Sequence, residues 1–170
     1  GLQSLLAGLE GNKSLVALNI SSNELGAQSA NPIARVLKMC SLLDLNLANN
    51  KLTDHGLEII APAFKNSSDN TLLERLDLSS NGLTTWGVSR LFEVLQKTLY
   101  LKKLILDDNN LSGKGMSSAT ALLWENISLV YLSFNNCDIE PDGGESIGIG
   151  LSRNMHLQTL LLQNNRLVMR

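Results

Sequence analysis

The 170-residue sequence predicts an α/β solenoid, in which strands and helices alternate through a right-handed coil of similar units. Three observations predict this fold. A leucine pattern recurs at a nearly constant step, an asparagine closes nearly every copy, and a helical pattern of apolar residues follows. A single unit of this kind cannot bury its apolar face, so the units are expected to stack on one another.

The recurring pattern is L-x-x-L-x-L-x-x-N, and its last residue is called the ladder position below. Its copies begin at Leu15, Leu42, Leu73, Leu101, Leu129 and Leu157, and the ladder positions hold Asn23, Asn50, Asn81, Asn109, Cys137 and Asn165. The ladder positions step by 27, 31, 28, 28 and 28 residues. The longer step coincides with a polar loop at residues 65–70, and surface loops tolerate insertions.

The first half of each unit predicts a short strand with one buried face. Leu76-Asp77-Leu78 and Leu104-Ile105-Leu106 show the alternation expected around such strands. The ladder asparagine is expected to satisfy backbone groups in the turn that follows, because its amide both donates and accepts hydrogen bonds. Cys137 offers only a weak thiol donor, so the fifth turn is expected to be looser.

The second half of each unit predicts a turn and then a helix. A glycine lies six residues after the ladder position at Gly56, Gly87, Gly115 and Gly143, with Ser29 in the first unit. Apolar pairs follow at ten and fourteen residues: Ile33 and Leu37, Ile60 and Phe64, Leu91 and Leu95, Ala119 and Leu123, Ile147 and Leu151. Thr53, Thr84 and Ser112 are predicted N-caps, and Asn12, Asn70, Asn126 and Asn154 are predicted left-handed helix ends.

Stacking of such units predicts an arc. Parallel strands lie about 4.8 Å apart, whereas packed helices need roughly 8 to 10 Å. The strands are therefore expected to line the concave face and the helices the convex face.

Units such as LDLNLANNKLTDHGLEIIAPAF and LERLDLSSNGLTTWGVSRLFEVL resemble the ribonuclease-inhibitor-like leucine-rich repeats, and the resemblance covers essentially the whole chain. The resemblance implies macromolecular binding inside eukaryotic cells, through the concave face or an edge. Relatives include ribonuclease inhibitor, the sensing arms of nucleotide-binding immune receptors, GTPase-activating proteins for Ran, tropomodulin-type actin regulators and ciliary scaffold proteins. This chain has few cysteines and lacks an acidic tail, so no specific activity of these relatives is carried over.

Composition narrows the function classes. A net charge of -2 provides no basic field for nucleic acid or anionic lipid, and no apolar stretch approaches the roughly 20 residues that span a bilayer. Cys40 and Cys137 are expected to be free thiols in a reducing compartment, which favours a cytoplasmic location. We expect no cofactor.

The chemically active residue types do not converge in the repeat register. His55 lies on the rim after the strands, His156 lies on the opposite rim, and Cys137 is three repeats from His55, so neither a metal site nor a catalytic pair is predicted. The glycine-rich run 142–150 lacks the end of a phosphate loop and is expected to be a weak, mobile helix. For Trp86 and Trp124, packing is favoured over binding.

Residues between the strand leucines are predicted to face the concave groove, and they give the candidate partner-binding site. From the third strand onward this face combines aromatic, basic and apolar side chains, which are enriched in interfaces. The candidate residues are Arg75, Asp77, Lys103, Ile105, Tyr131 and Leu161. The alternative is that this surface is solvated variation and that the real contact lies elsewhere on a longer parent protein.

The sequence therefore predicts one domain, residues 1–170, of about six repeats, which we expect to be a fragment of a longer array. The predicted function is a non-enzymatic scaffold that binds another protein; the alternative is a regulator of a GTPase that acts through one rim. Residues 2–9 resemble a helix without its own strand, so weak end-to-end self-association is also expected.

Overall fold

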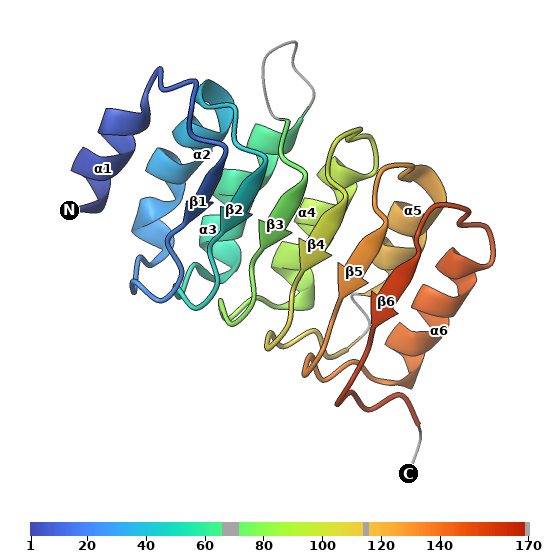
Figure 1. Cartoon of the computed structure of the whole chain (residues 1–170). Coiled ribbons are helices and arrows are strands. Elements are labelled where there is room, and N and C mark those ends of the chain that lie inside the picture. Colours follow the sequence, from blue (N-terminus) through green and yellow to red (C-terminus); the bar gives the residue numbers. More distant parts are fainter. Residues whose placement is uncertain (66–71, 114–115, 169–170) are drawn as a thin grey trace.

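The computed structural model describes residues 1–65, 72–113 and 116–168, which form one six-stranded parallel sheet with helices on one side (Figure 1). The sheet order is the chain order, so each strand pairs with the strands of the preceding and following units. The strands are β1 (Ala17–Asn19), β2 (Asp44–Asn46), β3 (Arg75–Asp77), β4 (Lys103–Ile105), β5 (Tyr131–Ser133) and β6 (Thr159–Leu161). This topology is that of the predicted solenoid.

The helices cover the face of the sheet that becomes the convex side of the stack (Figure 1). They are α1 (Leu2–Leu9), α2 (Ala30–Met39), α3 (Thr53–Ile60), α4 (Thr85–Leu95), α5 (Ser117–Glu125) and α6 (Pro141–Leu151), with 3-10 turns η1 (Ala27–Ser29) and η2 (Ala61–Phe64). The insertion expected at residues 65–70 lies almost entirely outside the described residues.

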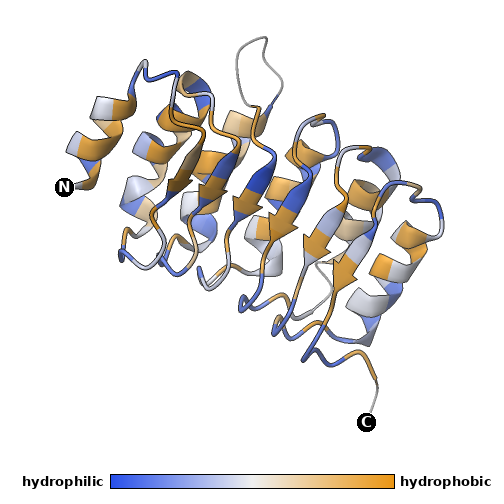
Figure 2. Ribbon diagram, in the orientation of Figure 1, coloured by the Kyte–Doolittle hydropathy of each residue, from blue (hydrophilic) through white to orange (hydrophobic). Residues whose placement is uncertain are grey.

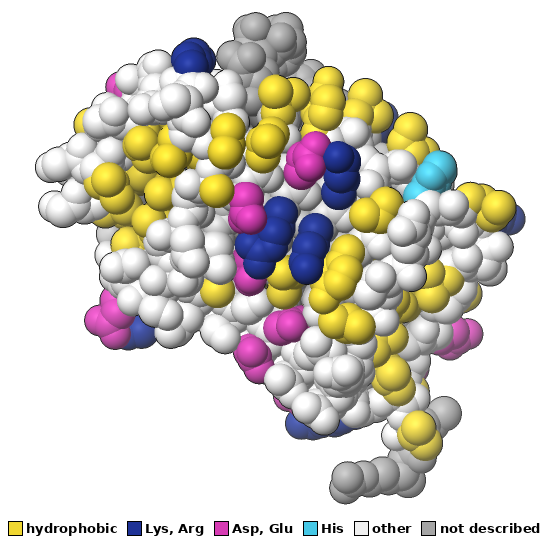
Figure 3. Space-filling view, in the orientation of Figure 1, with side chains coloured by type: hydrophobic (Ala, Val, Ile, Leu, Met, Phe, Trp, Pro, Cys, Tyr) yellow, Lys and Arg dark blue, Asp and Glu magenta, His cyan; other side chains and the backbone are white. Residues whose placement is uncertain are grey.

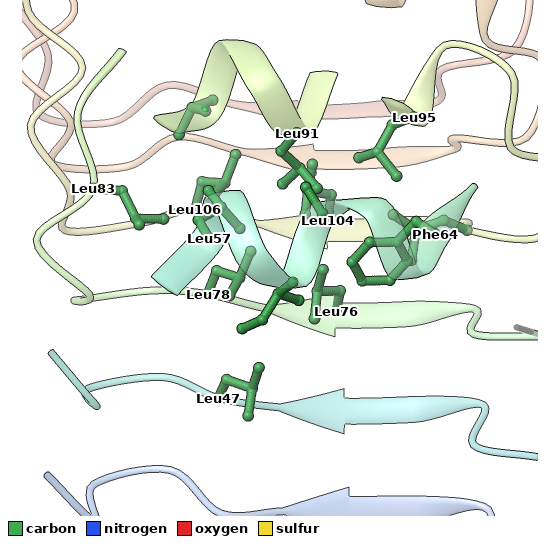
Figure 4. Packing of buried hydrophobic residues seen from close by; sticks show 14 of the residues in the cluster. Leu47, Leu57, Phe64, Leu76, Leu78, Leu83, Leu91, Leu95, Leu104 and Leu106 are labelled. Atoms are coloured by element: carbon green, nitrogen blue, oxygen red, sulfur yellow. The ribbon is translucent and has the colours of Figure 1, made fainter. Parts of the chain in front are cut away.

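The core lies between the sheet and the helices. The central strand leucines Leu45, Leu76, Leu104 and Leu132 are fully buried, and the leucines of β3 and β4 point toward Leu57 and Leu91 of the helices (Figure 4). Full burial of one such side chain contributes about 1.5–3 kcal/mol. The predicted helical stripe is confirmed except at Leu151, which remains 37% exposed.

The ladder asparagines join consecutive units, as their chemistry predicts. Asn81 Oδ1 accepts hydrogen bonds from the N–H groups of Asn50 (3.1 Å) and Leu52 (3.2 Å) in the preceding unit. Its Nδ2 donates to the carbonyls of Leu47, Leu78 and Ser79, each at 3.0 Å. One buried side chain thus satisfies five backbone groups in two turns, which both closes each turn and fixes the stacking register.

Cys137 reproduces only part of this arrangement. Its single S–H is shared between the carbonyls of Leu106 (3.2 Å) and Asn135 (3.3 Å). The Cys137 side chain has no amide oxygen that could accept a hydrogen bond from the preceding unit. Leu111 N–H instead donates to the backbone carbonyl of Cys137 at 2.8 Å. The surrounding turn keeps its left-handed residues Asn136 and Asp138, so the conformation is retained with fewer side-chain hydrogen bonds.

The left-handed residues lie elsewhere than the sequence predicted. Asn12, Asn126 and Asn154 do not have positive φ; Asn126, for example, is extended, with φ of -79° and ψ of 131°. Its Oδ1 accepts from Ser128 and Leu129, and its Nδ2 reaches Leu95 O of the preceding helix at 2.6 Å. Left-handed residues instead flank the ladder position: Ser22, Asn49, Ser80, Asp108, Asn136 and Asn164 directly precede it, and Glu24, Lys51, Gly82 and Asp138 directly follow it. Asn70 is outside the described residues.

Only one of the three predicted N-caps is confirmed. Thr84 Oγ1 accepts from Trp86 N at 3.2 Å at the start of α4. Thr53 is itself the first residue of α3, with φ of 57°, and Ser112 precedes α5 by several residues. The prediction was wrong at these two positions because the turn after the ladder position differs in length between units.

The glycines after the ladder position lie where a helix meets the preceding unit. A Cβ at Gly143 would lie 2.8 Å from Ile139 Cγ2 and 3.3 Å from Met116 Cγ, so the close approach requires glycine there. Gly56 and Gly87 are buried in the same way, and Gly115 lies outside the described residues. The glycine-rich run forms the complete helix α6.

Candidate functional site

The candidate site lies on the strand face, and the sheet register brings its residues onto neighbouring strands. Arg75 of β3 is paired with Lys103 of β4, and Lys103 is paired with Tyr131 of β5. Figure 3 shows basic side chains side by side in the middle of this face, with acidic side chains beside them. The polarity also changes along the sheet, since β2 and β3 carry hydrophilic residues and β6 is mainly hydrophobic (Figure 2).

Arg75 is held by two carboxylates. Its guanidinium nitrogens lie 2.9 Å from Asp44 Oδ1 on β2 and 3.1 Å from Asp77 Oδ2 on β3. The Asp77 side chain is only 12% exposed, and its Oδ1 also accepts from Ser79 N and Ser79 Oγ. Arg75 and Asp77 therefore form a neutralised, fixed group, and Asp44 leaves this group net negative.

Lys103 and Tyr131 form the second part of the site. Lys103 Nζ lies 3.9 Å from the centroid of the Tyr131 ring, within the range of a cation–π interaction. Both side chains are half-buried. The ring holds the ammonium in place next to the Arg75 group, so the site presents one ammonium and one aromatic ring beside an arginine that is already paired with two carboxylates.

Ile105 and Leu161 do not meet. They occupy equivalent positions on β4 and β6, with Ser133 of β5 between them. Ser133 is buried, and its Oγ donates to Asp107 Oδ1 at 2.5 Å. The position between Ile105 and Leu161 is therefore polar. On the sheet, Ser133 separates Leu161 from Ile105, while Leu161 lies on the strand next to Tyr131.

The residues with catalytic or metal-binding chemistry stay apart. Among the described residues, no group of three or more His, Cys, Asp or Glu side chains is arranged to hold a metal ion. Both cysteines are free and buried, as predicted. Burial raises the pKa of the Cys137 thiol to about 12 and also raises the pKa of Cys40, so neither side chain forms a thiolate readily.

The two tryptophans are half-exposed. Trp124 Nε1 donates to Ile149 O at 3.1 Å, and the Arg153 guanidinium lies 4.6 Å from the Trp124 ring centroid, so this residue joins α5 to the following unit. Trp86 is 50% exposed, with Arg90 at 6.0 Å from its ring. Trp124 thus has a packing role, whereas half of the Trp86 surface contacts solvent.

Sequence reasoning missed one surface. The helix-to-strand loops of the third to sixth units expose large apolar side chains at Leu72, Leu99, Tyr100, Ile127 and Met155, and Val16 and Leu43 are exposed in the first two loops. Three of these, Leu99, Ile127 and Met155, lie ten residues before their ladder positions, so the repeat register contains the signal. In Figure 3 hydrophobic side chains gather along the upper edge of the strand face, where these loops lie.

The fold and this surface define a class: a repeat protein that presents an open strand face. The leucine-rich repeat family model matches residues 11–34, 38–61, 69–92, 99–118 and 125–148. The chain belongs to the leucine-rich repeat family. In the part that the structure describes, no helix is long and apolar enough to span a membrane.

Several curated proteins are similar to this chain. NACHT, LRR and PYD domains-containing protein 14 of Mus musculus is 32% identical over 90% of the chain, and protein 5 of that series from Homo sapiens is 29% identical over 97%. The human capping protein, Arp2/3 and myosin-I linker protein 3 is 29% identical over 93%. The chain spans only 15%, 16% and 12% of these proteins, respectively.

Solved structures share the fold. The leiomodin-1 actin-binding site 2 superposes with a TM-score of 0.68 and 22% identity, covering 91% of this chain and 87% of that one. The C-terminal domain of Caenorhabditis elegans tropomodulin gives a TM-score of 0.64 with 18% identity, covering 89% and 94%. At these identities the similarity establishes the architecture alone.

Proposed function

We propose that this chain is a non-catalytic, cytoplasmic protein-interaction module whose strand face binds another protein. The observation that carries the proposal is the Lys103–Tyr131 pair beside Arg75 and its two carboxylates. Aromatic and arginine side chains dominate interface energies, and side chains already fixed before binding lose less entropy when a partner docks. The partner is therefore expected to contact Tyr131 and Lys103 at the centre of its footprint.

The comparisons support a protein as the partner class. One relative is named as a linker of capping protein, Arp2/3 and myosin-I, and one structural neighbour is an actin-binding site. The net charge of -2 and the mixed charges of the strand face favour a protein over nucleic acid.

The experiment compares proteins captured from cytoplasmic extract by the wild-type chain and by its variants, with quantitative mass spectrometry. Lys103→Glu and Tyr131→Ala should each lose the same partner by at least about tenfold, as expected at a hot spot. Lys38→Glu, on the exposed side of α2, is the matched control and should retain it. Capture of the same proteins by all four chains would contradict a strand-face site. Acceleration of GTP hydrolysis by Ran at catalytic amounts of the chain would replace the non-catalytic assignment.

A further inference from the structure

The helix-to-strand loops of the third to sixth units form an apolar strip, here called the apolar rim. It consists of Leu72, Leu99, Tyr100, Ile127 and Met155, exposed at 41%, 57%, 47%, 58% and 88%, respectively. The core does not need these side chains, because Leu73, Leu101 and Leu129 follow one or two residues later and are buried. Exposed apolar surface that runs across several units is typical of an interaction site.

Among the described residues, the register positions of Leu99 and Tyr100, ten and nine residues before the ladder position, carry exposed apolar side chains only from the third unit onward. In the first two units the exposed apolar residues of these loops are Val16 (50%) and Leu43 (37%), which lie seven residues before the ladder position. At the equivalent positions the first two units have Lys13, Ser14 and Ser41, together with Cys40, which is buried. The rim therefore begins in the third unit, the same unit where Arg75 opens the basic and aromatic part of the strand face. Val130, half-buried beside Tyr131, lies between the two surfaces along the chain.

The spacing along the rim fits a helix lying across the units. Sheet-like hydrogen bonding extends to the residues just before the strands: Lys102 N donates to Glu74 O (2.8 Å), Val130 N to Lys102 O, and Gln158 N to Val130 O (both 2.9 Å). The unit-to-unit step is therefore near the strand spacing of about 4.8 Å. One turn of an α-helix advances about 5.4 Å, so one side chain per turn meets one unit. Same-face residues of an extended peptide are about 6.8 Å apart and fit less well.

Charge along the border of the rim favours an acidic edge on that helix. Within two positions of a rim residue the sequence has three basic residues, Lys97, Lys102 and Arg153, and two acidic residues, Glu74 and Glu125. The border of the rim therefore has a net charge of +1, in a chain whose net charge is -2. Lys102 Nζ forms an ion pair with Glu74 Oε1 at 2.7 Å, and both side chains are about half exposed. The Lys102 ammonium therefore already pairs with a carboxylate at this border.

We propose that the apolar rim docks an amphipathic helix of a partner protein, with apolar side chains at one per turn on Leu99, Ile127 and Met155 and carboxylates toward Lys102 and Arg153. This proposal rests on the proposed function only in that the ligand is a protein. The apolar rim is a second binding surface, separate from the strand face. A helix that covers Leu72 to Met155 crosses three steps, roughly 15 Å, which requires about ten residues.

The test uses two fluorescein-labelled helical peptides of about 18 residues. Both have leucines on one face; one has glutamates along the edge of that face and the other has lysines there. Anisotropy should show that the glutamate peptide binds the wild-type chain more tightly than the lysine peptide. Ile127→Asp should weaken binding at least about tenfold, whereas Ile149→Asp, on α6 and 46% exposed, is the matched control and should bind normally. Lys102→Glu should reverse the preference between the peptides.

Three outcomes would overturn the proposal. They are no binding of the glutamate peptide, equal binding by Ile127→Asp, and preference of the wild-type chain for the lysine peptide. Concentration-dependent self-association that Ile127→Asp abolishes and the peptide does not compete would assign the rim to a second copy instead. Tyr131→Ala should still bind the peptide, so failure at the rim and failure of the strand-face site are distinguishable.

Discussion

At the residue scale, the ladder position determines how firmly one unit is joined to the next. Asn50 and Asn109 are buried, and each amide bonds to the backbone of its own unit and the preceding one. Cys137 provides one S–H, shared between two carbonyls, where an asparagine provides up to five hydrogen bonds, so the junction between the fourth and fifth units has fewer side-chain bonds. The ladder therefore makes the stability of the stack unequal along its length.

Replacing a ladder asparagine should measure this contribution. Asn50→Ala and Asn109→Ala should each lower the free energy of unfolding by about 1 to 3 kcal/mol, because several buried backbone groups lose their partners. Asn23→Ala is the matched control: Asn23 is exposed at the first unit and its Nδ2 donates only within its own turn, so its loss should cost less. Urea unfolding measures all three, and equal costs would contradict the role of the ladder in joining units.

At the element scale, the strands and the helical stripes were predictable because both depend on periodic burial. The residues that determine local backbone geometry were less predictable. Left-handed backbone at Ser80 or Asn136 and the absence of a cap at Ser112 depend on the path of each turn, which residue type alone does not determine. The sheet register places Arg75 beside Asp44 and Lys103 beside Tyr131, but the ion pair and the cation–π contact also depend on side-chain conformations, which the register does not determine.

The glycines of α6 provide an element-scale prediction. A Cβ at Gly150 would lie 2.8 Å from Leu123 Cδ1 and 3.2 Å from Thr120 Cα, so α6 packs directly against α5 at this residue. Gly150→Ala should therefore destabilise the fold by about 1 to 3 kcal/mol through overpacking. Gly148 lies on the same helix with no atom near its missing Cβ, so Gly148→Ala should instead stabilise by roughly 0.5 to 1 kcal/mol. Thermal denaturation that raises both midpoints would show that the glycines act only through helix propensity.

At the scale of the whole molecule, the stack is uniform in its middle and less packed at its ends. The central leucines of β2 to β5 are fully buried, whereas Leu18 of β1 and Leu160 of β6 are only partly buried. Hollows of about 590 Å³ and about 1050 Å³ lie at the amino-terminal and carboxy-terminal ends, respectively. Because each unit is stabilised by its neighbours, the end units have lower local stability.

The last prediction concerns the 170-residue chain in solution. Amide exchange should be fastest in α1 and β6 and slowest in β2 to β4, where strands have partners on both sides. The end hollows expose Leu5 (50%) and Val168 (80%), so weak end-to-end association should appear in sedimentation at high concentration. Leu5→Asp and Val168→Asp should each weaken this association, because both partner surfaces are needed, whereas Ile127→Asp on the rim should leave it unchanged. Uniform protection in all six units together with a strictly monomeric state at high concentration would contradict the prediction, since the end units would then be as stable as the middle.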